Sequence, residues 1–309
     1  MIRVSNVNFE RDRKILNNIN FTVKKGEVFG IVGPSGAGKS TLLAIIGGLL
    51  DATSGNVKLE KEIIYGPKDR LIPGHPEIQI VNQEFGLDLY HTVKENLSVK
   101  ANHLTIAIKQ EFIEELLQLL ELKSVENQQA ITLSGGEKQR LALARALIME
   151  SKVILLDEPF AHMDAHIKRK VINYLIALKK TRKTSFIFVT HEGLDVLTLA
   201  DRIAYFNYGE INRIDNPLNF FENPTNYQEG LFFGELNEIK LGNKTYLIRP
   251  NTISTHNFHN AIEITVKFSH AIYAGGFYQN YFQFKKNKTI IFYHNEILKD
   301  ANKIYIKKN

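Results

Sequence analysis

The sequence has no cysteine among its 309 residues. This absence excludes disulfide bonds, cysteine zinc sites and thiol catalysis, and it is consistent with a cytoplasmic protein. Long apolar runs are also missing: the longest, Leu42–Leu50, has nine residues, whereas a membrane-spanning helix needs about 20. No apolar stretch follows Met1, so no secretory signal is predicted. We therefore expect a soluble, intracellular protein that would reach a membrane only through a partner.

A strong excess of one charge is missing as well. The chain has 39 Lys and Arg against 33 Asp and Glu, a net charge of +6, and its densest basic clusters, Lys285–Lys288 and Lys307–Lys308, are short. Nucleic-acid-binding tails typically carry much longer basic blocks. The remaining composition, 44% hydrophobic and 23% charged, is that of an ordinary globular protein. The length allows one large domain or two modest ones.

Strand and helix patterns alternate over roughly the first 190 residues. Runs of alternating or continuous apolar residues predict strands at Ile2–Val4, Val7–Phe9, Ile15–Val23, Val28–Val32, Val153–Leu156 and Phe186–Val189. Apolar residues at three- and four-residue steps predict helices at residues 42–46, within 92–123, at Gly136–Met149 and around Ala165–Lys180. This alternation predicts an α/β fold with a mostly parallel sheet covered on both faces.

The pattern changes near residues 223–226. Beyond it, short strands are predicted at Tyr246–Ile248, Ile262–Phe268, Tyr278–Phe284, Thr289–Tyr293 and Ile304–Ile306, with turns at Gly275–Gly276 and Lys286–Asn287. We place a boundary at about 230–235, which gives domains at 1–233 and 234–309. The second domain is expected to be a small β-barrel or sandwich. Its many aromatic residues are expected to fill the barrel, the alternative being a surface on which nucleic-acid bases stack.

A glycine-rich segment directly follows the predicted strand Val28–Val32. It fits the pattern G-x-x-x-x-G-K-[ST] of a phosphate-binding loop. Glycines let successive backbone N–H groups point at one anion, and the N-terminus of the next helix adds positive potential. We expect Lys39 to reach the β- and γ-phosphates and Ser40 to bind Mg²⁺. The predicted nucleotide-binding residues of this loop are Gly33, Pro34, Ser35, Gly36, Ala37, Gly38, Lys39, Ser40 and Thr41.

Two acidic residues end the apolar strand Val153–Leu156. Asp157 is expected to hold Mg²⁺ through a water molecule, as an acid after a buried strand does in phosphate-loop enzymes. Glu158 is placed to act as the general base for the water that attacks the γ-phosphate. Paired acids also occur at helix N-termini for structural reasons alone. The phosphate loop earlier in the chain favours the catalytic interpretation.

A second glycine-containing turn precedes the helix predicted at Gly136–Met149. In Leu133-Ser134-Gly135-Gly136-Glu137, Ser134 and Glu137 fit a capping box, which is a purely structural alternative. A capping box does not need the two glycines. Gly135 and Gly136 would let the phosphate of another molecule approach backbone N–H groups, so we predict an anion site at the start of this helix.

These motifs together resemble the nucleotide-binding subunit of an ATP-binding cassette (ABC) transporter over about residues 2–233. LSGGE at 133–137 resembles the signature that distinguishes this family from other phosphate-loop ATPases. The resemblance implies ATP and Mg²⁺ as ligands and a P-loop NTPase fold with a RecA-like core, an antiparallel β subdomain and a helical subdomain. It also implies that two cassettes pair head to tail. Each ATP would then lie between the phosphate loop of one chain and Ser134–Gly136 of the other.

Two further residues match positions of this family. Gln83, at the end of Ile80-Val81-Asn82-Gln83, matches the glutamine that senses Mg²⁺ and faces the membrane subunit. His191, after Phe188-Val189-Thr190, matches the switch histidine that contacts the γ-phosphate. The resemblance thus implies Ser40, Gln83 and Asp157 as metal ligands. It implies a catalytic set of Lys39, Gln83, Glu158 and His191.

The chain departs from the family pattern at three places. Where the family reads like Ser-Ala-Leu-Asp, residues 161–164 are Ala-His-Met-Asp; Asp164 is retained, which implies contact with nucleotide and communication between cassettes, but His162 is unusual. The adenine-stacking aromatic is expected where Arg11 stands, with Phe9 two residues earlier, and a guanidinium also stacks on a base. The lead-in at 128–132 lacks the proline common in sugar and iron importers.

Two short C-terminal segments favour import. Leu247–Asn251 resembles the start of the small OB-like (TOBE) domain of importers of iron, oxyanions, polyamines or sugars, and Phe233–Asn237 resembles the linker before it. The implied partners are transmembrane permease subunits, a second cassette and a solute-binding protein, with no nucleic acid. The implied location is peripheral, at the cytoplasmic face of the inner membrane.

Two alternatives remain open. An ABC exporter can also carry a C-terminal appendage. A nucleic-acid-associated ABC protein would use the OB-like domain and the positive charge. However, the segment between Thr41 and Leu133 is too short for the coiled coil of chromosome-structuring relatives, and only one phosphate loop and one LSGGE are present, whereas translation-factor relatives carry two.

Overall fold

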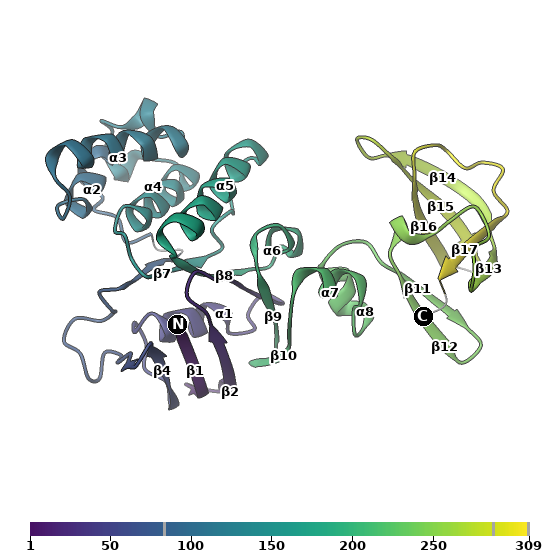
Figure 1. Cartoon of the computed structure of the whole chain (residues 1–309), viewed down its shortest axis with the longest axis horizontal. Coiled ribbons are helices and arrows are strands. Elements are labelled where there is room, and N and C mark those ends of the chain that lie inside the picture. Colours follow the sequence, from purple (N-terminus) through teal and green to yellow (C-terminus); the bar gives the residue numbers. More distant parts are fainter. Residues whose placement is uncertain (83–84, 286–287, 308–309) are drawn as a thin grey trace. The chain divides into compact units, whose positions relative to one another are not determined.

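The structure, a computed structural model, describes residues 1–82, 85–285 and 288–307. It divides into two compact units, Met1–Pro217 and Leu218–Asn309, whose elements are labelled in Figure 1. Among the described residues, no helix has both the length and the apolar character needed to cross a bilayer.

A six-stranded sheet is the centre of the first unit. Its strand order is β10-β9-β3-β8-β7-β6, and all neighbouring strands run parallel except β10, which is antiparallel to β9. The strands are β3 (Val28–Val32), β6 (Ile78–Val81), β7 (Val153–Asp157), β8 (Ser185–Thr190), β9 (Arg202–Asn207) and β10 (Glu210–Asp215). Every residue of β3, β7 and β8 is buried, as expected where both faces of a parallel sheet are covered.

A second, antiparallel sheet packs against one side of this unit. Its order is β2-β1-β4-β5, with β1 at Ile2–Glu10, β2 at Lys14–Val23, β4 at Ser54–Leu59 and β5 at Glu62–Ile63. The two strands predicted at 2–4 and 7–9 are one strand, β1. Its pairing register with β2 shifts between Val4 and Val7, and Asn6 has a left-handed φ of 48°, which interrupts the apolar alternation.

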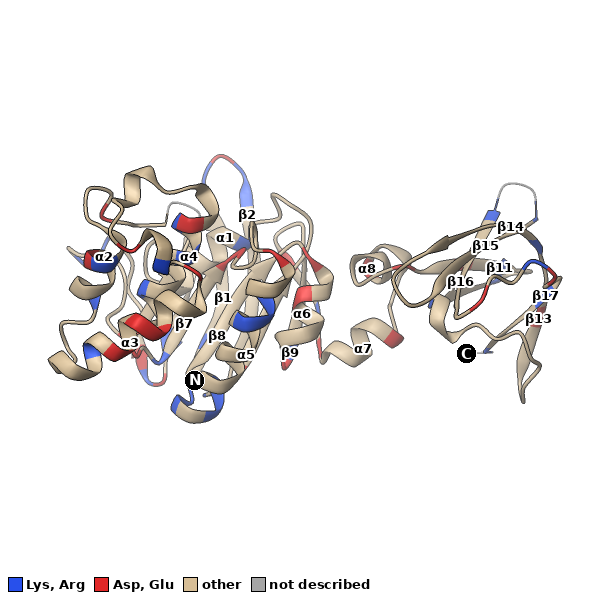
Figure 2. Cartoon of the chain, turned by 90° about the horizontal axis from the view of Figure 1, so that it is seen from above, with Lys and Arg blue, Asp and Glu red and all other residues tan. Residues whose placement is uncertain are grey.

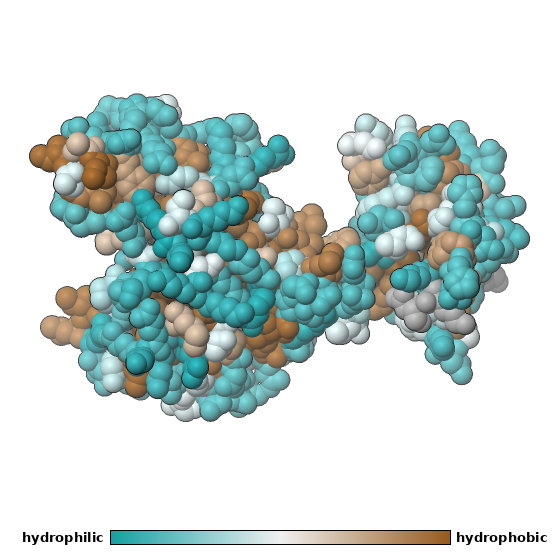
Figure 3. Space-filling model, in the orientation of Figure 1, coloured by the Kyte–Doolittle hydropathy of each residue, from teal (hydrophilic) through white to brown (hydrophobic). Residues whose placement is uncertain are grey.

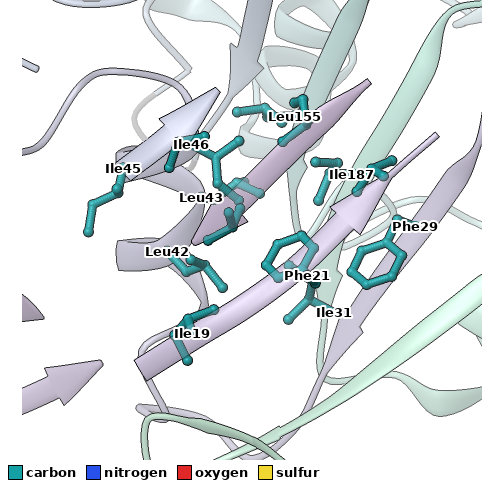
Figure 4. Close-up of a cluster of buried hydrophobic side chains, with 14 of the residues drawn as sticks. Ile19, Phe21, Phe29, Ile31, Leu42, Leu43, Ile45, Ile46, Leu155 and Ile187 are labelled. Atoms are coloured by element: carbon teal, nitrogen blue, oxygen red, sulfur yellow. The ribbon is translucent and has the colours of Figure 1, made fainter. Parts of the chain in front are cut away.

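One hydrophobic core joins this antiparallel sheet, helix α1 (Lys39–Ile46) and one face of the central sheet (Figure 4). Phe21 and Phe29 stack with ring centroids 5.0 Å apart, which ties β2 to β3. The central strands contribute alternate residues such as Leu155 and Ile187, because successive side chains of a strand point to opposite faces. The core therefore fixes β3 and α1, which hold the phosphate loop between them.

Helices complete the first unit. The region predicted as helical at 92–123 forms α2 (Val93–Lys100) and α3 (Ile106–Leu119), followed by short 3-10 turns at Lys123–Val125 and Ala130–Thr132. The other helices are α4 (Gly135–Leu147), α5 (Ala165–Arg182) and α6 (Gly193–Leu199). Helix α6 packs so closely on β3 that a Cβ at Gly30 would lie 2.0 Å from a methyl carbon of Val196. The predicted α/β fold with an antiparallel and a helical subdomain is confirmed.

The second unit contains helices α7 (Pro217–Glu222) and α8 (Tyr227–Phe232) and a β region. Its strands form three small sheets, β11-β12, β13-β17 and β14-β15-β16, around a common hydrophobic core. Their bounds are Asn237–Leu241, Lys244–Ile248, Ala261–Thr265, Lys267–Tyr273, Tyr278–Phe284, Lys288–His294 and Lys303–Lys307 for β11 to β17 in chain order. A 3-10 turn, η3, lies at Pro250–Thr252.

The single strand predicted at Ile262–Phe268 is two strands, β13 and β14. They divide at Val266 because β13 pairs with β17 whereas β14 pairs with β15. The turn predicted at Gly275–Gly276 joins β14 and β15, and both glycines have positive φ. The turn predicted at Lys286–Asn287 lies outside the described residues.

Arg249 fastens the two helices of this unit to its β region. Its buried guanidinium donates hydrogen bonds to the backbone oxygens of Phe221 (2.7 Å), Gly230 (2.9 Å), Gly234 (2.9 Å) and Glu235 (3.2 Å). Burial lowers the pKa of Arg249 to about 10, so the group is still charged at neutral pH. By packing, helix α8 therefore belongs with the strands that follow it, and the boundary predicted at 233/234 falls inside this unit.

We expect Arg249→Leu to destabilise the second unit, because it leaves these carbonyl oxygens, including that of the buried Gly230, without the guanidinium donor. Each unsatisfied buried group costs about 1–3 kcal/mol, so the unit should melt or be proteolysed well before the parent. Thermal unfolding and limited proteolysis measure this, with exposed Arg169→Leu as the control. A parent-like melting curve and digestion pattern for Arg249→Leu would contradict this role.

Candidate active site

The turn from β3 into α1 is shaped by close backbone contacts. Gly33 has φ +156°, and a Cβ there would lie 1.8 Å from the backbone oxygen of Phe206. Gly38 has φ +104°, and its Cβ would lie 3.0 Å from the backbone oxygen of Ile15. Side chains are excluded at both positions, and the loop wraps around the start of α1.

Lys39, the first residue of α1, reaches back across this loop. Its Nζ donates hydrogen bonds to the backbone oxygens of Gly33 (2.8 Å) and Pro34 (2.9 Å). Burial lowers the pKa of the ammonium group, and the negative charges of Glu158 and Asp157 oppose that effect. Phosphate oxygens would be stronger acceptors than these neutral carbonyls, since hydrogen bonds between charged partners are about twice as strong.

Asp157 is the last residue of β7, and the structure brings it together with Ser40. Burial raises the pKa of the Asp157 carboxyl, whereas the nearby Ser40 side chain lowers it. The Oδ1 atom of Asp157 is buried and has no hydrogen-bond partner among the described residues. A buried carboxylate oxygen left unpaired beside a hydroxyl fits the oxygen ligands that Mg²⁺ prefers. Gln83, the third predicted metal ligand, lies outside the described residues.

Glu158 is held by its backbone and points its carboxylate at His191. It adopts a left-handed φ of 51°; its N–H donates to the backbone oxygen of Val189 (3.0 Å), and its own backbone oxygen accepts from Gln139 Nε2 (2.6 Å). Its Oε1 lies 2.8 Å from Nδ1 of His191, which directly follows β8. This hydrogen bond raises the pKa of His191.

Asp157, Glu158 and His191 line one cavity of about 490 Å³. It is lined by Ser35, Phe85, Gln139, Asp157, Glu158, Ala161, His162 and His191. The phosphate loop, both strand-end acids and the histidine therefore converge, because the parallel strands β3, β7 and β8 end at the same edge of the sheet. A γ-phosphate on the loop would face a carboxylate able to take a proton from water and an imidazole able to donate a hydrogen bond.

Four residues of this cavity, Phe85, Gln139, Ala161 and His162, were not predicted as site residues. Gln139 is buried in α4 and holds the backbone of Glu158; a buried glutamine three residues after Gly136 gives no sign of this from sequence, because the contact joins segments far apart in the chain. His162, noted above only as unusual, lines the cavity from a turn where its φ is +61°.

The predicted signature residues lie elsewhere. Ser134 caps α4 and Glu137 bonds back to it, so the structural alternative, a capping box, is present. Ser134 and Gly135 are nonetheless exposed, and a Cβ added at Gly135 would meet no atom within 4 Å. Packing within this chain therefore does not explain the glycine at 135, and the start of α4 is open to another molecule.

Two further predicted residues are also on the surface. Asp164 caps α5, accepting hydrogen bonds from the backbone N–H groups of His166 (2.8 Å) and Ile167 (3.0 Å), and these bonds lower its pKa. Arg11 is exposed in the turn between β1 and β2. The cavity beside that turn is lined by Arg13, and Arg11 is not part of its lining.

The fold and the site define a phosphate-loop nucleotide-binding protein with acidic residues at the strand ends beside the loop. Comparison with known proteins narrows the class. Residues 16–161 match the family model described as ABC transporter. The sulfate/thiosulfate import ATP-binding protein CysA of Pseudomonas syringae pv. tomato is 36% identical over 78% of this chain and 75% of its own length. The chain belongs to the ABC transporter family.

Other similar proteins agree with this assignment. The spermidine/putrescine import ATP-binding protein PotA of Thermotoga maritima is 36% identical, and the match covers 77% of this chain and 65% of that relative's length. A dimeric post-hydrolysis structure of the ATP-binding cassette MJ0796 with ADP and Pi superposes with a TM-score of 0.62 at 29% identity, covering 70% of this chain and 99% of that one. Fold and family are those of an ABC ATPase, as the sequence motifs predicted.

We expect Glu158→Gln to lower the pKa of His191 toward its ordinary value, because the anionic acceptor is lost. In the parent, the Glu158–His191 pair stabilises the folded chain fully at pH values below the pKa of an unfolded-state histidine. This stabilisation is lost as the pH rises through the raised pKa of His191. NMR titration of the His191 ring measures the shift. The control is Glu192→Gln, because Glu192 lies 3.5 Å from the other ring nitrogen and affects the pKa less. An unchanged His191 pKa in Glu158→Gln would contradict the observed hydrogen bond.

Proposed function

We propose that this chain hydrolyses ATP to power an ABC importer of a small solute. The observation that carries the proposal is the Glu158–His191 hydrogen bond, which lies in one cavity with the phosphate loop. Such a pair suits hydrolysis of a terminal phosphate, because the carboxylate can activate water while the imidazole contacts the γ-phosphate. The polyamine and sulfate importers among the relatives favour a polyamine or oxyanion cargo, within the predicted set that also includes iron and sugars.

The predicted site residues and Gln139 would each have a part in this reaction. The backbone N–H groups of the loop and Lys39 would bind the triphosphate, and Ser40 with Asp157 would hold Mg²⁺, which shields charge on the β- and γ-phosphates when bound. Glu158 would accept the proton of the attacking water. Gln139 would keep the Glu158 backbone in its left-handed conformation and so aim the carboxylate. Gln83 is proposed to join the metal ligands.

A second copy of the chain would complete the site. Ser134, Gly135 and Gly136 start helix α4, where the helix dipole attracts anions, and Gly135 leaves room for one. Head-to-tail pairing would bring this helix start against the triphosphate held by the partner's loop. Ser134 would then exchange its hydrogen bond to Glu137 for one to a phosphate oxygen. Asp164 would stay at the start of α5 and link the two cassettes.

The remaining partners follow from the same proposal. We keep the domains proposed from the sequence, a cassette at 1–233 and a TOBE-like domain at 234–309, although helices α7 and α8 pack with the second unit. The exposed apolar residues Leu89, Tyr90 and Val99 follow Gln83 in the chain and would offer a surface to a transmembrane permease subunit. Figure 3 shows hydrophobic residues in small groups on a mostly hydrophilic face of the molecule. With a permease and a solute-binding protein, the chain would work peripherally at the cytoplasmic face of the inner membrane.

The charge distribution disfavours the nucleic-acid alternative. Figure 2 shows Lys and Arg interspersed with Asp and Glu rather than gathered in one basic stripe. Nucleic-acid sites concentrate positive charge along the path of the phosphate backbone. CysA and PotA, the relatives named above, are import ATP-binding proteins, which favours an importer over an exporter.

We expect Lys39→Ala to weaken ATP binding roughly 10- to 100-fold, because a charge-assisted hydrogen bond is worth about 1.5–3 kcal/mol. Isothermal titration calorimetry with a non-hydrolysable ATP analogue measures the affinity. Exposed Lys94→Ala is the matched control. Parent-like affinity in Lys39→Ala would contradict the assignment of the phosphate loop.

We expect Glu158→Gln to lower the rate of ATP hydrolysis at least about 100-fold, since general-base catalysis typically contributes that much. ATP that is bound but not cleaved should hold two cassettes together, so size-exclusion chromatography with Mg²⁺ and ATP should show a dimer. Glu192→Gln is the control, being the other carboxylate beside His191. A monomeric Glu158→Gln variant at saturating Mg²⁺ and ATP would contradict the shared site.

A further inference from the structure

A second cavity lies on the other side of the phosphate loop. It has a volume of about 540 Å³ and is lined by Arg13, Lys14, Ile15, Pro34, Ser35, Gly36, Ala37, Asn207, Tyr208 and Gly209. In the sheet, β3 stands between β8, which ends at His191, and β9, which ends at Asn207. Ser35 lines both this cavity and the acidic one. The loop therefore separates an acidic cavity from one lined by cationic and aromatic residues.

This arrangement gives a bound nucleotide a direction. The γ-phosphate belongs beside Glu158 and His191, because those groups carry the hydrolytic chemistry. A triphosphate lying along the loop then places its nucleoside on the β9 side, where the second cavity opens. A volume of about 540 Å³ lies within the usual range for small-molecule sites.

Tyr208 is the aromatic residue in the lining of that cavity. It lies in the turn between β9 and β10, has a left-handed φ of 47°, and its side chain is 91% exposed. The turn itself is anchored: the N–H of Asn17 donates to the backbone oxygen of Gly209 (2.8 Å), and a Cβ at Gly209 would lie 2.3 Å from the Ile15 backbone oxygen. An almost fully exposed ring on an anchored turn is available to stack with a ligand.

The turn between β1 and β2 supplies cations instead of an aromatic ring. Its residues Arg11, Asp12 and Arg13 contain no aromatic side chain, and of the two arginines Arg13 lines the cavity. A guanidinium stacks on a flat base as an aromatic ring does. Tyr208 and Arg13 thus line one cavity from two different turns, with the phosphate loop as a third side.

We infer that Tyr208 is the residue on which the adenine base of bound ATP stacks, and that Arg13 contacts the same nucleoside. This assignment replaces the predicted role of Arg11. It rests on the proposed function, because the direction of the nucleotide is set by hydrolysis beside Glu158.

The chain contains no tryptophan, so Tyr208→Trp places a single indole in the proposed base site. Stacking of adenine on that indole should quench its fluorescence when ATP or ADP binds. Inorganic tripolyphosphate, which has no base, should leave the emission nearly unchanged while competing with ATP. Tyr273→Trp, exposed in the second unit, is the control and should not respond. If the fluorescence of the indole at position 208 does not change at saturating ATP, the assignment is overturned.

Affinity measurements separate this inference from the proposed function. Base–aromatic stacking is worth about 1–3 kcal/mol, so Tyr208→Ala should weaken ATP binding roughly 5- to 150-fold while leaving the affinity for tripolyphosphate unchanged. Tyr208→Phe should bind ATP like the parent. If Lys39→Ala binds ATP more weakly than the parent and Tyr208→Ala does not, only the assignment of Tyr208 to the adenine base fails. If Arg11→Ala weakens ATP binding more than Tyr208→Ala does, the adenine-stacking role belongs to Arg11.

Discussion

The site depends on one constraint, the close approach of backbone around the turn between β3 and α1. Gly33 lies against the Phe206 backbone and Gly38 against the Ile15 backbone, so the loop has no room for other side chains at these positions. The buried ammonium of Lys39 is satisfied by two carbonyl oxygens of the same loop. The site is thus preorganised for an anion: the amides, the helix N-terminus and the ammonium are in place before any phosphate arrives.

The ends of the parallel strands then place different residues on the two sides of this loop. On one side, β7 ends at Asp157 and β8 ends just before His191. Glu158, which has a left-handed φ, directs its carboxylate toward that histidine. On the other side, β9 ends at a turn that carries an exposed tyrosine. In the proposed binding mode, strand order would give the nucleotide its direction, because residues at neighbouring strand ends share one edge of the sheet. The α/β fold and the catalytic geometry are therefore one arrangement.

Much of the fold and of the phosphate loop was predictable from the sequence, because local residue patterns determine them. The buried strand Val28–Val32 was predicted with its observed bounds, and the glycines of the loop indicated a phosphate site before any contact was known. Contacts between distant segments were not predictable: Gln139 supports Glu158 from another element, and Arg249 fastens α8 to the β region. Strands β13 and β14 were merged because no turn residue separates them, only a change of partner. The family pattern predicts the adenine-stacking residue at Arg11, but the cavity beside that turn is lined by Arg13 and not by Arg11.

The central claim is that the phosphate loop of one chain is closed by the start of α4 of another. Because the chain has no cysteine, Ser35→Cys and Ser134→Cys can each be placed alone in a Glu158→Gln background. Mixing the two variants with Mg²⁺, ATP and a mild oxidant should give a disulfide-linked heterodimer that does not form without nucleotide. A mixture that binds ATP yet yields no cross-linked heterodimer would contradict the claim.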